Sequence, residues 1–370
     1  MWPQLWALGI KIHFAHRTFK WNNEGRGKAA VHCVIIGFGP DEPVRRVLFD
    51  YEKIDGDAHA VEVRNINPYL VDASDSVLPN RSRPICAVPE IGIGNKPIDG
   101  GHYLFTAEEK IVFIDREPSA APWFRRWIGA EEFLNGSERW CLWLGDCPPD
   151  QLRRMPEVMK RVEAVRQFRL SSKSAPTRTL ASTPTRFHVE NMPSSSYLVL
   201  PEVTSERRSF IPMGFLGPDT LCSNLVKIAR NATLFHFGIL QSTMHMAWVR
   251  AVSGRLKSDF RYSAGIVYNN FPWPDAPSEK QRETIKAAAQ GVIDARAQFP
   301  QSTLADLYDP LSMPPGLMRA HHALDRAVDA AYRFKGKTDA ERVAFLFERY
   351  QRLTTLLPVA KPVRRSTLRA

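Results

Sequence analysis

Residues 10–36, IKIHFAHRTFKWNNEGRGKAAVHCVII, decide how the chain begins to fold. Ile10–Ala15 alternates β-prone apolar residues with polar ones, residues 22–27 are rich in turn formers, and Val31–Ile36 is an apolar run. This order predicts a β-hairpin over residues 10–38. A hairpin this apolar needs a larger sheet to join, and too little chain precedes it to supply one. We therefore expect the hairpin to be the last piece of a sheet that this sequence does not encode.

Composition sets the broad class. The chain has 370 residues, of which 44% are hydrophobic and 24% charged, which indicates a globular protein of two or three domains. It contains no secretory signal and no apolar stretch of about 18 residues, so we expect a cytoplasmic protein that does not cross a membrane. The five cysteines are scattered without a CxxC pair, so the sequence supports neither a disulfide framework nor a zinc ribbon.

The charge points to a polyanionic partner. Fifty Lys and Arg against 39 Asp and Glu give a formal net charge of +11. The surplus is concentrated: residues 153–186 hold nine basic and two acidic residues, and residues 207–262 hold eight basic and two acidic residues. Basic clusters in the middle of a chain are typical of nucleic-acid binding. A basic but unspecialised surface is the alternative.

Residues 44–275 mix short strands, loops rich in Pro and Gly, and a few helices. The spacing of Val158, Val162, Val165 and Phe168 predicts one helix over Leu152–Leu170, and residues 171–184 have the composition of a loop. A long apolar stretch without proline predicts a single, partly buried helix over Thr233–Ala251. The prolines of residues 271–274 mark a rigid boundary.

After Pro277 the sequence becomes helical. Ser278, with Glu279 in the first turn, predicts a helix up to about Phe299, and a second helix follows Pro315. Thr338 and Glu341 have the spacing of a capping box at the start of a third helix, Thr338–Leu357. Residues 359–370 are a basic tail. The chain as a whole is predicted to be α+β.

Few motifs for catalysis or cofactor binding are present. Gly37-Phe38-Gly39 follows an apolar strand but precedes no helix-forming sequence, so it offers no helix N-terminus to a cofactor. Asn67-Pro68-Tyr69 lacks one proline of a methyltransferase catalytic loop and is interpreted as a linker. The histidine pairs 13/16 and 321/322 have no third ligand at metal spacing, so no metal site is expected. Glu108-Glu109-Lys110 lacks the spacer residue of a nuclease core.

Phe19 and Trp21 stand two apart on the first strand of the hairpin and therefore share a face. Enzymes that modify a base within a duplex extrude that base and stack it on aromatic groups. Phe19 and Trp21 are our candidates for such a stacking platform. Ordinary packing within the sheet is the alternative.

Several segments carry a family resemblance, in the same order along nearly the whole chain. They are Ile12–Phe38, Gly94–Gly101, Arg139–Leu144, Ser205–Arg208, His245–Arg250, Gly254–Ser258, Tyr268–Pro274 and Leu304–Pro310. The first resembles the end of the methyltransferase domain of MmeI-like (type IIL) restriction–modification enzymes. The next six resemble their target-recognition domain, and the last resembles their helical C-terminal domain.

This resemblance implies a domain order. Residues 1–43 would be a remnant of the C-terminal end of a class I methyltransferase domain, represented by an incomplete β-hairpin. Residues 44–275 would be a mixed α/β target-recognition domain that binds DNA, residues 276–358 the helical C-terminal domain, and residues 359–370 the tail.

The resemblance also implies N6-methylation of adenine in double-stranded DNA, with S-adenosyl-L-methionine as the donor in full-length members. The Gly-rich donor loop and the Asn-Pro-Pro-Tyr/Phe catalytic loop have no counterpart here. We therefore expect no catalytic residues and no cofactor bound by this chain alone, which would be a fragment, a degraded gene product or a subunit completed by a separate chain. The competing hypothesis is a compact, active methyltransferase with a donor site around Gly37–Asp41.

Candidate DNA-binding residues are cations and polar groups beside turn residues, because Arg and Lys contact phosphates and guanine edges. They are Arg81, Arg83, Lys96, Asp99, Arg207, Arg208, Arg255, Lys257 and Arg261. A solvated surface role is the alternative for each one singly.

Overall fold

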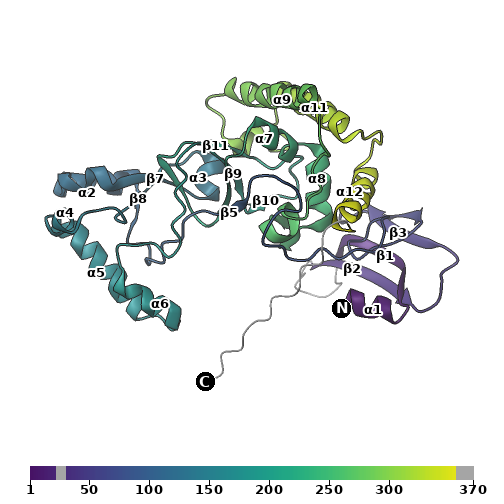
Figure 1. The fold of residues 1–370 in the computed structure, drawn as a ribbon, viewed down its shortest axis with the longest axis horizontal. Helices are drawn as coiled ribbons and strands as arrows, with labels where there is room; N and C mark the ends of the chain where they lie inside the picture. The colour runs from purple at the N-terminus through teal and green to yellow at the C-terminus, as the bar shows by residue number, and fades with distance from the viewer. Residues whose placement is uncertain (22–30, 356–370) are drawn as a thin grey trace. The chain divides into compact units, whose positions relative to one another are not determined.

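The computed structural model describes residues 1–21 and 31–355. They form two compact units, each described here by itself (Figure 1). Unit 1 comprises Met1–Cys86, Asn269–Trp273 and the chain from Gly336 onward, and unit 2 comprises Ala87–Tyr268 and Pro274–Lys335. The α+β class expected from the sequence is confirmed.

Unit 1 is built on a four-stranded sheet of order β2-β1-β3-β4. Its elements are α1 (Trp2–Ala7), β1 (Lys11–Trp21), β2 (Val31–Gly39), β3 (Arg46–Tyr51), β4 (Ala58–Val63) and α12 (Asp339–Thr355). The predicted hairpin is confirmed, because β1 and β2 pair antiparallel from Lys11↔Gly39 to Trp21↔Val31. Its predicted turn, residues 22–27, lies outside the described residues, as does the basic tail.

The other partner of the hairpin comes from later in the chain. Strand β3 pairs parallel to β1, and β4 pairs antiparallel to β3. Ile12 and Ala15 of β1 and Leu48 of β3 are buried and belong to the hydrophobic core of this unit. The expectation that this sequence offers the hairpin no sheet to join was therefore wrong, because the partner strands follow the hairpin instead of preceding it.

Unit 2 contains three sheets, of orders β11-β9-β13-β5, β12-β7-β8-β6 and β10-β15-β14. The strands are β5 (Ile91–Ile93), β6 (Leu104–Thr106), β7 (Phe124–Ile128), β8 (Arg139–Leu142), β9 (Tyr197–Pro201), β10 (Val203–Thr204), β11 (Gly214–Leu216), β12 (Thr220–Cys222), β13 (Val226–Arg230), β14 (Gly254–Leu256) and β15 (Asp259–Arg261). The helices are α2 (Ala107–Arg116), α3 (Ala130–Asn135), α4 (Pro149–Arg153), α5 (Pro156–Leu170), α6 (Ala175–Thr179), α7 (Leu234–Leu240), α8 (Thr243–Val252), α9 (Glu279–Ala297), α10 (Leu304–Leu307) and α11 (Pro315–Tyr332), with 3₁₀ turns at Pro118–Trp123 and Leu180–Ser182 and a π-helical turn at Ala264–Tyr268.

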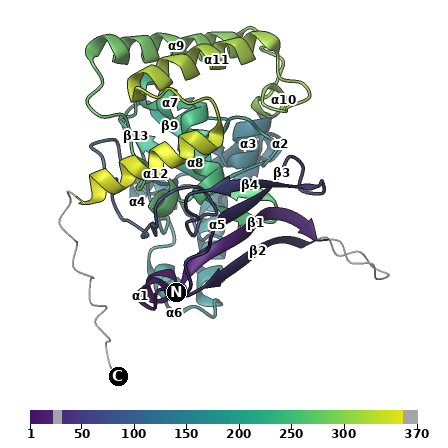
Figure 2. The same ribbon diagram turned by 90° about the vertical axis from the view of Figure 1, so that its right-hand side faces the viewer.

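The helices of unit 2 gather in two groups. In Figure 1, α2, α4, α5 and α6 lie around β7 and β8 at one end of the unit. At the other end α9 and α11 run side by side and pack on α7 and α8, which is also visible in Figure 2. Among residues 1–21 and 31–355, no helix combines the length and the apolar character needed to span a bilayer.

The C-terminal helices agree with their predicted caps. Ser278 accepts a hydrogen bond from the backbone N–H of Gln281 at the start of α9, and α11 begins at Pro315. Thr338 and Glu341 form the predicted capping box of α12, since each side chain accepts the other's backbone N–H, at 3.2 and 2.9 Å. The last of these helices belongs to unit 1, although the sequence grouped it with the other two.

Two central helices differ from the prediction. The stretch expected as one helix over Thr233–Ala251 is two, because the chain breaks at Gln241–Ser242 and Ser242 caps α8 by accepting from the His245 N–H. The helix expected over Leu152–Leu170 is α4 followed by α5, interrupted before Pro156. Part of the loop expected at residues 171–184 forms α6 and a 3₁₀ turn.

The buried face of α5 also differs from the prediction. Val158, Val162 and Val165 are buried as expected, but the next buried position is Arg169, and Phe168 is 42% exposed. The fully buried Arg169 guanidinium donates hydrogen bonds of 2.7–2.9 Å to five backbone carbonyls, those of Pro97, Ile98, Leu180, Thr183 and Arg186. One side chain therefore joins the C-terminal end of α5 to two separate loops.

Arg169→Met is expected to lower the free energy of unfolding by at least about 3 kcal/mol, because each buried acceptor left without a donor costs about 1–3 kcal/mol. Urea unfolding followed by circular dichroism measures this. Arg166→Met, an exposed position on the same helix, is the control and should change stability by about 0.5 kcal/mol or less. Equal effects of the two substitutions would contradict the role given to Arg169.

Candidate nucleic-acid interface

The candidate cations of residues 205–261 come together on one small sheet of unit 2. Strand β10 pairs with β15 at Val203↔Arg261 and Thr204↔Phe260, and β15 pairs with β14 through a tight hairpin. We call β10, β14, β15 and the adjoining residues 205–208 the basic sheet. Its candidate residues are Arg207, Arg208, Arg255, Lys257 and Arg261. The chain thus joins two basic segments that are some fifty residues apart in the sequence.

Glu202 holds the inner edge of the basic sheet. Its carboxylate accepts from Lys227 Nζ at 2.7 Å and from Arg261 Nε at 2.9 Å. Burial alone would raise the pKa of Glu202, but the hydrogen bonds from Lys227 and Arg261 outweigh it and hold the pKa below its ordinary value. The Lys227 ammonium is 8% exposed, whereas the Arg261 side chain is 60% exposed. Lys227 is therefore a structural partner of Glu202, and Arg261 is accessible to a ligand.

Arg255 is fixed within the hairpin. Its guanidinium lies 3.9 Å above the Phe260 ring, donates to the Ser258 carbonyl at 2.6 Å and sits 3.4 Å from the Glu206 carboxylate. Burial lowers the pKa of Arg255, and the nearby Glu206 and Asp259 counteract this effect. The guanidinium stays charged at neutral pH in a fixed position, because the pKa of arginine starts far above that range.

Arg207 and Lys257 lie in turns of the basic sheet. Both are exposed, and Lys257 occupies the hairpin turn with a left-handed φ of 56°. Arg208 is half-buried: burial lowers its pKa, and the charges of Asp309 and Asp259 oppose that shift. The basic sheet thus offers outward-facing positive groups on a scaffold that carries its own carboxylates.

Lys96 and Asp99 lie in a different part of unit 2. Lys96 is exposed, and its backbone pairs with that of Val189. The buried Asp99 carboxylate accepts from the backbone N–H groups of Gly101 and Tyr103, at 3.2 and 2.8 Å. Both carboxylate oxygens of Asp99 thus accept hydrogen bonds within the turn, so this side chain has a structural role.

The glycine before this turn serves packing as well. A Cβ on Gly94 would come within 2.4 Å of the Cys222 carbonyl oxygen. The close approach that the glycine permits is therefore to neighbouring backbone.

Arg81 and Arg83 belong to unit 1. Arg81 Nε donates to Asn270 Oδ1 at 2.8 Å, and the Arg81 carbonyl accepts from Asn269 Nδ2 at 2.8 Å. Arg81 thereby anchors its loop to the segment at 269–273, whereas Arg83 is exposed. Of the two, Arg83 has the more accessible side chain.

Phe19 and Trp21 lie together in an aromatic row on the sheet of unit 1. Their ring centroids are 6.0 Å apart, and Phe19 stacks on Tyr51 of β3 at 5.3 Å and 18°. Tyr51 in turn shares a 2.7 Å hydrogen bond with His16 Nδ1. Trp21 is 50% exposed, and a pocket of about 360 Å³ opens between these aromatic residues and the turn at residues 54–56.

The Gly37–Gly39 stretch does not fit a donor-binding loop. Both glycines lie within β2, and a Cβ on Gly37 would come 2.1 Å from the Phe14 ring. Gly37 therefore makes room for an aromatic side chain of the neighbouring strand, and the chain continues into β3 without a helix. This geometry argues against the competing hypothesis of a donor site at Gly37–Asp41.

Asn67-Pro68-Tyr69 is a structural turn of unit 1. Asn67 is buried, and its Oδ1 accepts from the Tyr69 N–H at 2.9 Å. The Tyr69 hydroxyl accepts from the Leu78 N–H, also at 2.9 Å. These contacts agree with the interpretation of the segment as a linker.

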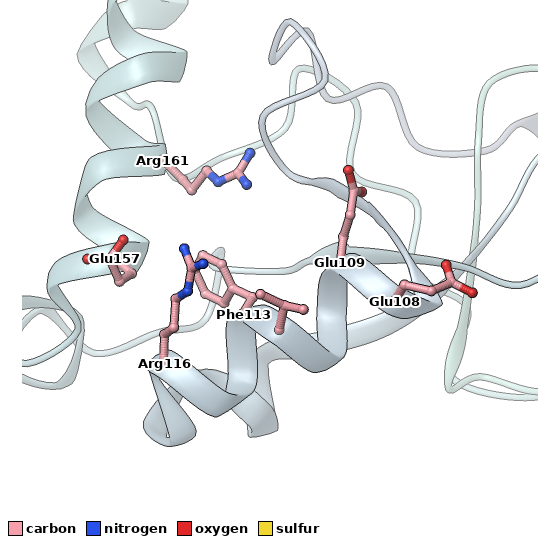
Figure 3. A pocket seen from close by; sticks show the side chains of 7 residues that line it. Glu108, Glu109, Phe113, Arg116, Glu157 and Arg161 are labelled. Atoms are coloured by element: carbon pink, nitrogen blue, oxygen red, sulfur yellow. The ribbon is translucent and has the colours of Figure 1, made fainter.

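A second pocket of about 360 Å³ lies between α2 and α5 (Figure 3). Glu108 and Glu109 line it from the start of α2, Arg116 from the end of α2, and Glu157 and Arg161 from α5. Glu109 is the capping residue of α2, and Lys110 lies 3.1 Å from the Trp140 ring centroid. Glu108 and Glu109 thus stabilise the N-terminal turn of α2. Within residues 1–21 and 31–355 no group of three potential ligands is placed to hold a metal ion.

Sequence reasoning missed Glu202, Phe260 and Tyr51, which support the candidate residues. Phe49 and Tyr51 alternate along β3, and that pattern signals an aromatic strand face. Glu202 gave no such signal, because its partners are 25 and 59 residues away in the sequence.

Comparison with known proteins places this architecture. Residues 72–275 match the family described as "MmeI, target recognition domain", residues 277–358 match "MmeI, C-terminal domain", and residues 1–50 match "MmeI, DNA-methyltransferase domain". The chain belongs to the MmeI family. The resemblance inferred from the sequence is thereby confirmed.

Two relatives of the MmeI family show how much of such a protein this chain spans. A solved structure of the type IIL restriction-modification enzyme MmeI in complex with DNA is 49% identical, with a TM-score of 0.90, over 96% of this chain and 47% of that chain. DNA methyltransferase A of Bacillus subtilis (strain 168) is 40% identical over 358 residues, which are 96% of this chain and 40% of the relative. The chain thus spans less than half the length of either relative.

The candidate residues divide between the matched MmeI regions. The basic sheet, Lys96, Arg81 and Arg83 fall within the target-recognition match, whereas Phe19 and Trp21 fall within the methyltransferase match. The basic sheet therefore lies in the region that matches the target recognition domain of MmeI.

Glu202→Gln is expected to lower the free energy of unfolding by about 2 kcal/mol at neutral pH, because it leaves the buried Lys227 without its carboxylate. The folded-state pKa of Glu202 is lowered, so this stabilisation is complete above the carboxyl's ordinary value of 4.5 and is lost as the pH falls through the folded value. Urea titrations from neutral pH to below the folded-state pKa should show the stabilities of the wild type and Glu202→Gln converging. Glu206→Gln is the control, with a loss of about 1 kcal/mol or less, and a pH-independent gap for Glu202→Gln would contradict the assignment.

Proposed function

We propose that this chain recognises duplex DNA in a sequence-specific manner, as the C-terminal part of a site-specific adenine N6-methyltransferase of the MmeI family. The observation that carries the proposal is the basic sheet, which collects five candidate cations from two distant segments. A protein that binds duplex DNA in this way is proposed to act in the cytoplasm.

The groups on the basic sheet suit two kinds of DNA contact. Arg207 and Lys257 are exposed and extend from turns, as groups that neutralise phosphates do. Arg255 and Arg261 are oriented by the Glu206 and Glu202 carboxylates, and a guanidinium held in this way presents its donors to a guanine edge with little further loss of entropy. Arg208 adds positive charge behind them.

Lys96 and Arg83 are proposed as further phosphate contacts, because both side chains are exposed. Asp99 and Arg81 are not carried into the proposal. The backbone amides around Asp99 and the side chain of Asn270 already engage them.

Phe19 and Trp21 are proposed as the stacking platform for an extruded base. One face of Phe19 is covered by Tyr51, which leaves the half-exposed Trp21 as the ring with more free surface beside the pocket. Aromatic rings hold an unstacked base through dispersion and π contacts.

Methyl transfer is proposed to need more than this chain. S-adenosyl-L-methionine is the donor expected for a methyltransferase of this family, but the Gly37–Gly39 strand does not fit it. We therefore propose that this chain alone does not bind the donor and acts together with the rest of a methyltransferase domain.

Replacing Arg207 and Lys257 together by Ala should weaken binding to a mixed-sequence DNA duplex. Removing one cation from a phosphate should reduce the slope of log K against log salt by about 0.9, so the double variant should reduce it by about 2. Fluorescence anisotropy between about 50 and 200 mM salt measures both the affinity and the slope. Lys280→Ala with Arg319→Ala removes the same charge from exposed positions of α9 and α11 and should leave the slope nearly unchanged. Equal slopes for the two double variants would refute the basic sheet as the DNA-binding surface.

Isothermal titration of the 370-residue chain with S-adenosyl-L-methionine should give no binding heat, whereas a methyltransferase that binds the donor gives heat under the same conditions. Adding a separate chain with the N-terminal part of an MmeI relative should restore methyl transfer from labelled donor to DNA. If this chain alone bound S-adenosyl-L-methionine at micromolar affinity, the proposal that it lacks a donor site would be wrong. That result would favour a compact, active methyltransferase.

A further inference from the structure

The basic sheet has two arms, and its own strands hold them together only weakly. Arm one is Ser205–Met213, which carries Arg207 and Arg208, and arm two is the β14–β15 hairpin. Strand pairing joins them only through the two residues of β10, which precede arm one. Two contacts of 3.4 Å add to it, from Arg255 to the Glu206 carboxylate and from the Glu206 N–H to Asp259. A two-residue ladder fixes few backbone groups, so the placement of the arms depends on what else they contact.

Helix α11 contacts arm one through His321. The His321 ring stacks on the Phe210 ring with centroids 3.9 Å apart and an 18° angle between the planes. Phe210 follows Arg208 by two residues. Both rings are buried, and His321 Nε2 shares a 2.8 Å hydrogen bond with the Tyr308 hydroxyl.

Further contacts fix the remainder of arm one. The Met213 carbonyl accepts from Arg296 Nη1 of α9 at 2.6 Å, and the Ile211 carbonyl accepts from Gln241 Nε2. Arg296 also donates to Gln241 Oε1 at 2.6 Å and to the Tyr308 hydroxyl at 2.8 Å. The second half of arm one, from Phe210 to Met213, is therefore held by α9 and α11 of the C-terminal match and by Gln241 at the end of α7.

Asp325, one turn beyond His321 on the same helix, contacts α8, the helix that precedes arm two. The Asp325 carboxylate accepts from both the backbone N–H and the hydroxyl of Thr243, each at 2.7 Å. Thr243 is the first residue of α8, which leads directly into the hairpin. Two residues further along α8, His245 shares a 3.0 Å hydrogen bond with Tyr262, the residue after β15.

We infer that α11 is a positioning element for DNA binding, in which His321 sets arm one and Asp325 sets arm two. The two residues stand four apart and share one helix face, so a single rigid helix fixes the spacing of both groups of cations. Burial and the nearby charge of Arg296 lower the pKa of His321 to about 3, so the ring is neutral at physiological pH and acts through its packing. The inference rests on the proposed DNA binding.

The test uses the 370-residue chain and a labelled mixed-sequence duplex, with anisotropy measured over the same salt range. His321→Leu keeps apolar volume but removes the flat ring from Phe210. It should weaken binding about tenfold and reduce the salt slope by about 1 to 2, because the cations of arm one would no longer be held against phosphates. His321→Phe restores a flat ring and should return both values toward wild type. His322→Ala, at the exposed neighbouring position, is the control and should change neither.

Asp325→Asn removes one acceptor without leaving a cavity and keeps the test decisive if His321→Leu does not fold. It should reduce affinity and salt slope through arm two. A role confined to stability would lower the unfolding midpoint of these variants and leave the affinity and slope of the folded protein unchanged, which would overturn the inference. If the double variant Arg207→Ala, Lys257→Ala also leaves the salt slope unchanged, both the proposed DNA binding and the positioning inference fail. If the double variant changes the slope and the α11 variants do not, only the positioning inference fails.

Discussion

The buried guanidinium of Arg169 is the interaction on which the first half of unit 2 depends. Five backbone carbonyls replace its hydration, and all of them belong to connecting segments whose regular structure is limited to the 3₁₀ turn Leu180–Ser182. Burying a charge is costly unless its hydrogen-bonding capacity is satisfied, and here all five N–H donors of the guanidinium are used. The loops at residues 97–98 and 180–186 can thus be irregular and still be fixed, which is what a surface built from loops requires.

In the candidate DNA-binding surface, half-buried carboxylates are surrounded by cations, whereas at Arg169 a buried cation is surrounded by acceptors. The cations of the basic sheet are arranged around Glu202 and Glu206, so that the sheet gathers positive charge without the repulsion that an uncompensated cluster would have. The Glu202 and Glu206 side chains are 20% and 29% exposed, whereas that of Arg261 is 60% exposed. The surface therefore keeps a positive exterior while each inner charge retains a partner.

Local patterns in the sequence predicted the local structure well. The capping residues Ser278 and Thr338 and the turn-separated strands of the hairpin carry their signal within a few residues, and each was found as expected. Long-range pairing was not predictable. Strand β10 is two residues long, too short for any periodicity, although it joins the two basic segments. On α5 the helical spacing predicted the three buried valines correctly, but the fourth buried residue is Arg169 and not Phe168. Hydrophobicity favours burial of Phe168, and the sequence does not reveal the five distant carbonyls that bind Arg169. The candidate site was recognisable as a set of cations, but not their inner carboxylates, whose partners are remote in the chain.

The double pairing of Glu202 has a consequence for how the surface responds to a ligand. Lys227 is buried and stays with the carboxylate, whereas Arg261 lies mostly in solvent. If Arg261 turns from Glu202 to a phosphate or a base, the carboxylate still has a counter-ion, so the exchange strands no buried charge and requires little rearrangement of the sheet. Replacement of Arg261 by an uncharged residue is tolerable for the same reason, and this leaves the outer layer of the site free to diverge while the layer beneath it is constrained.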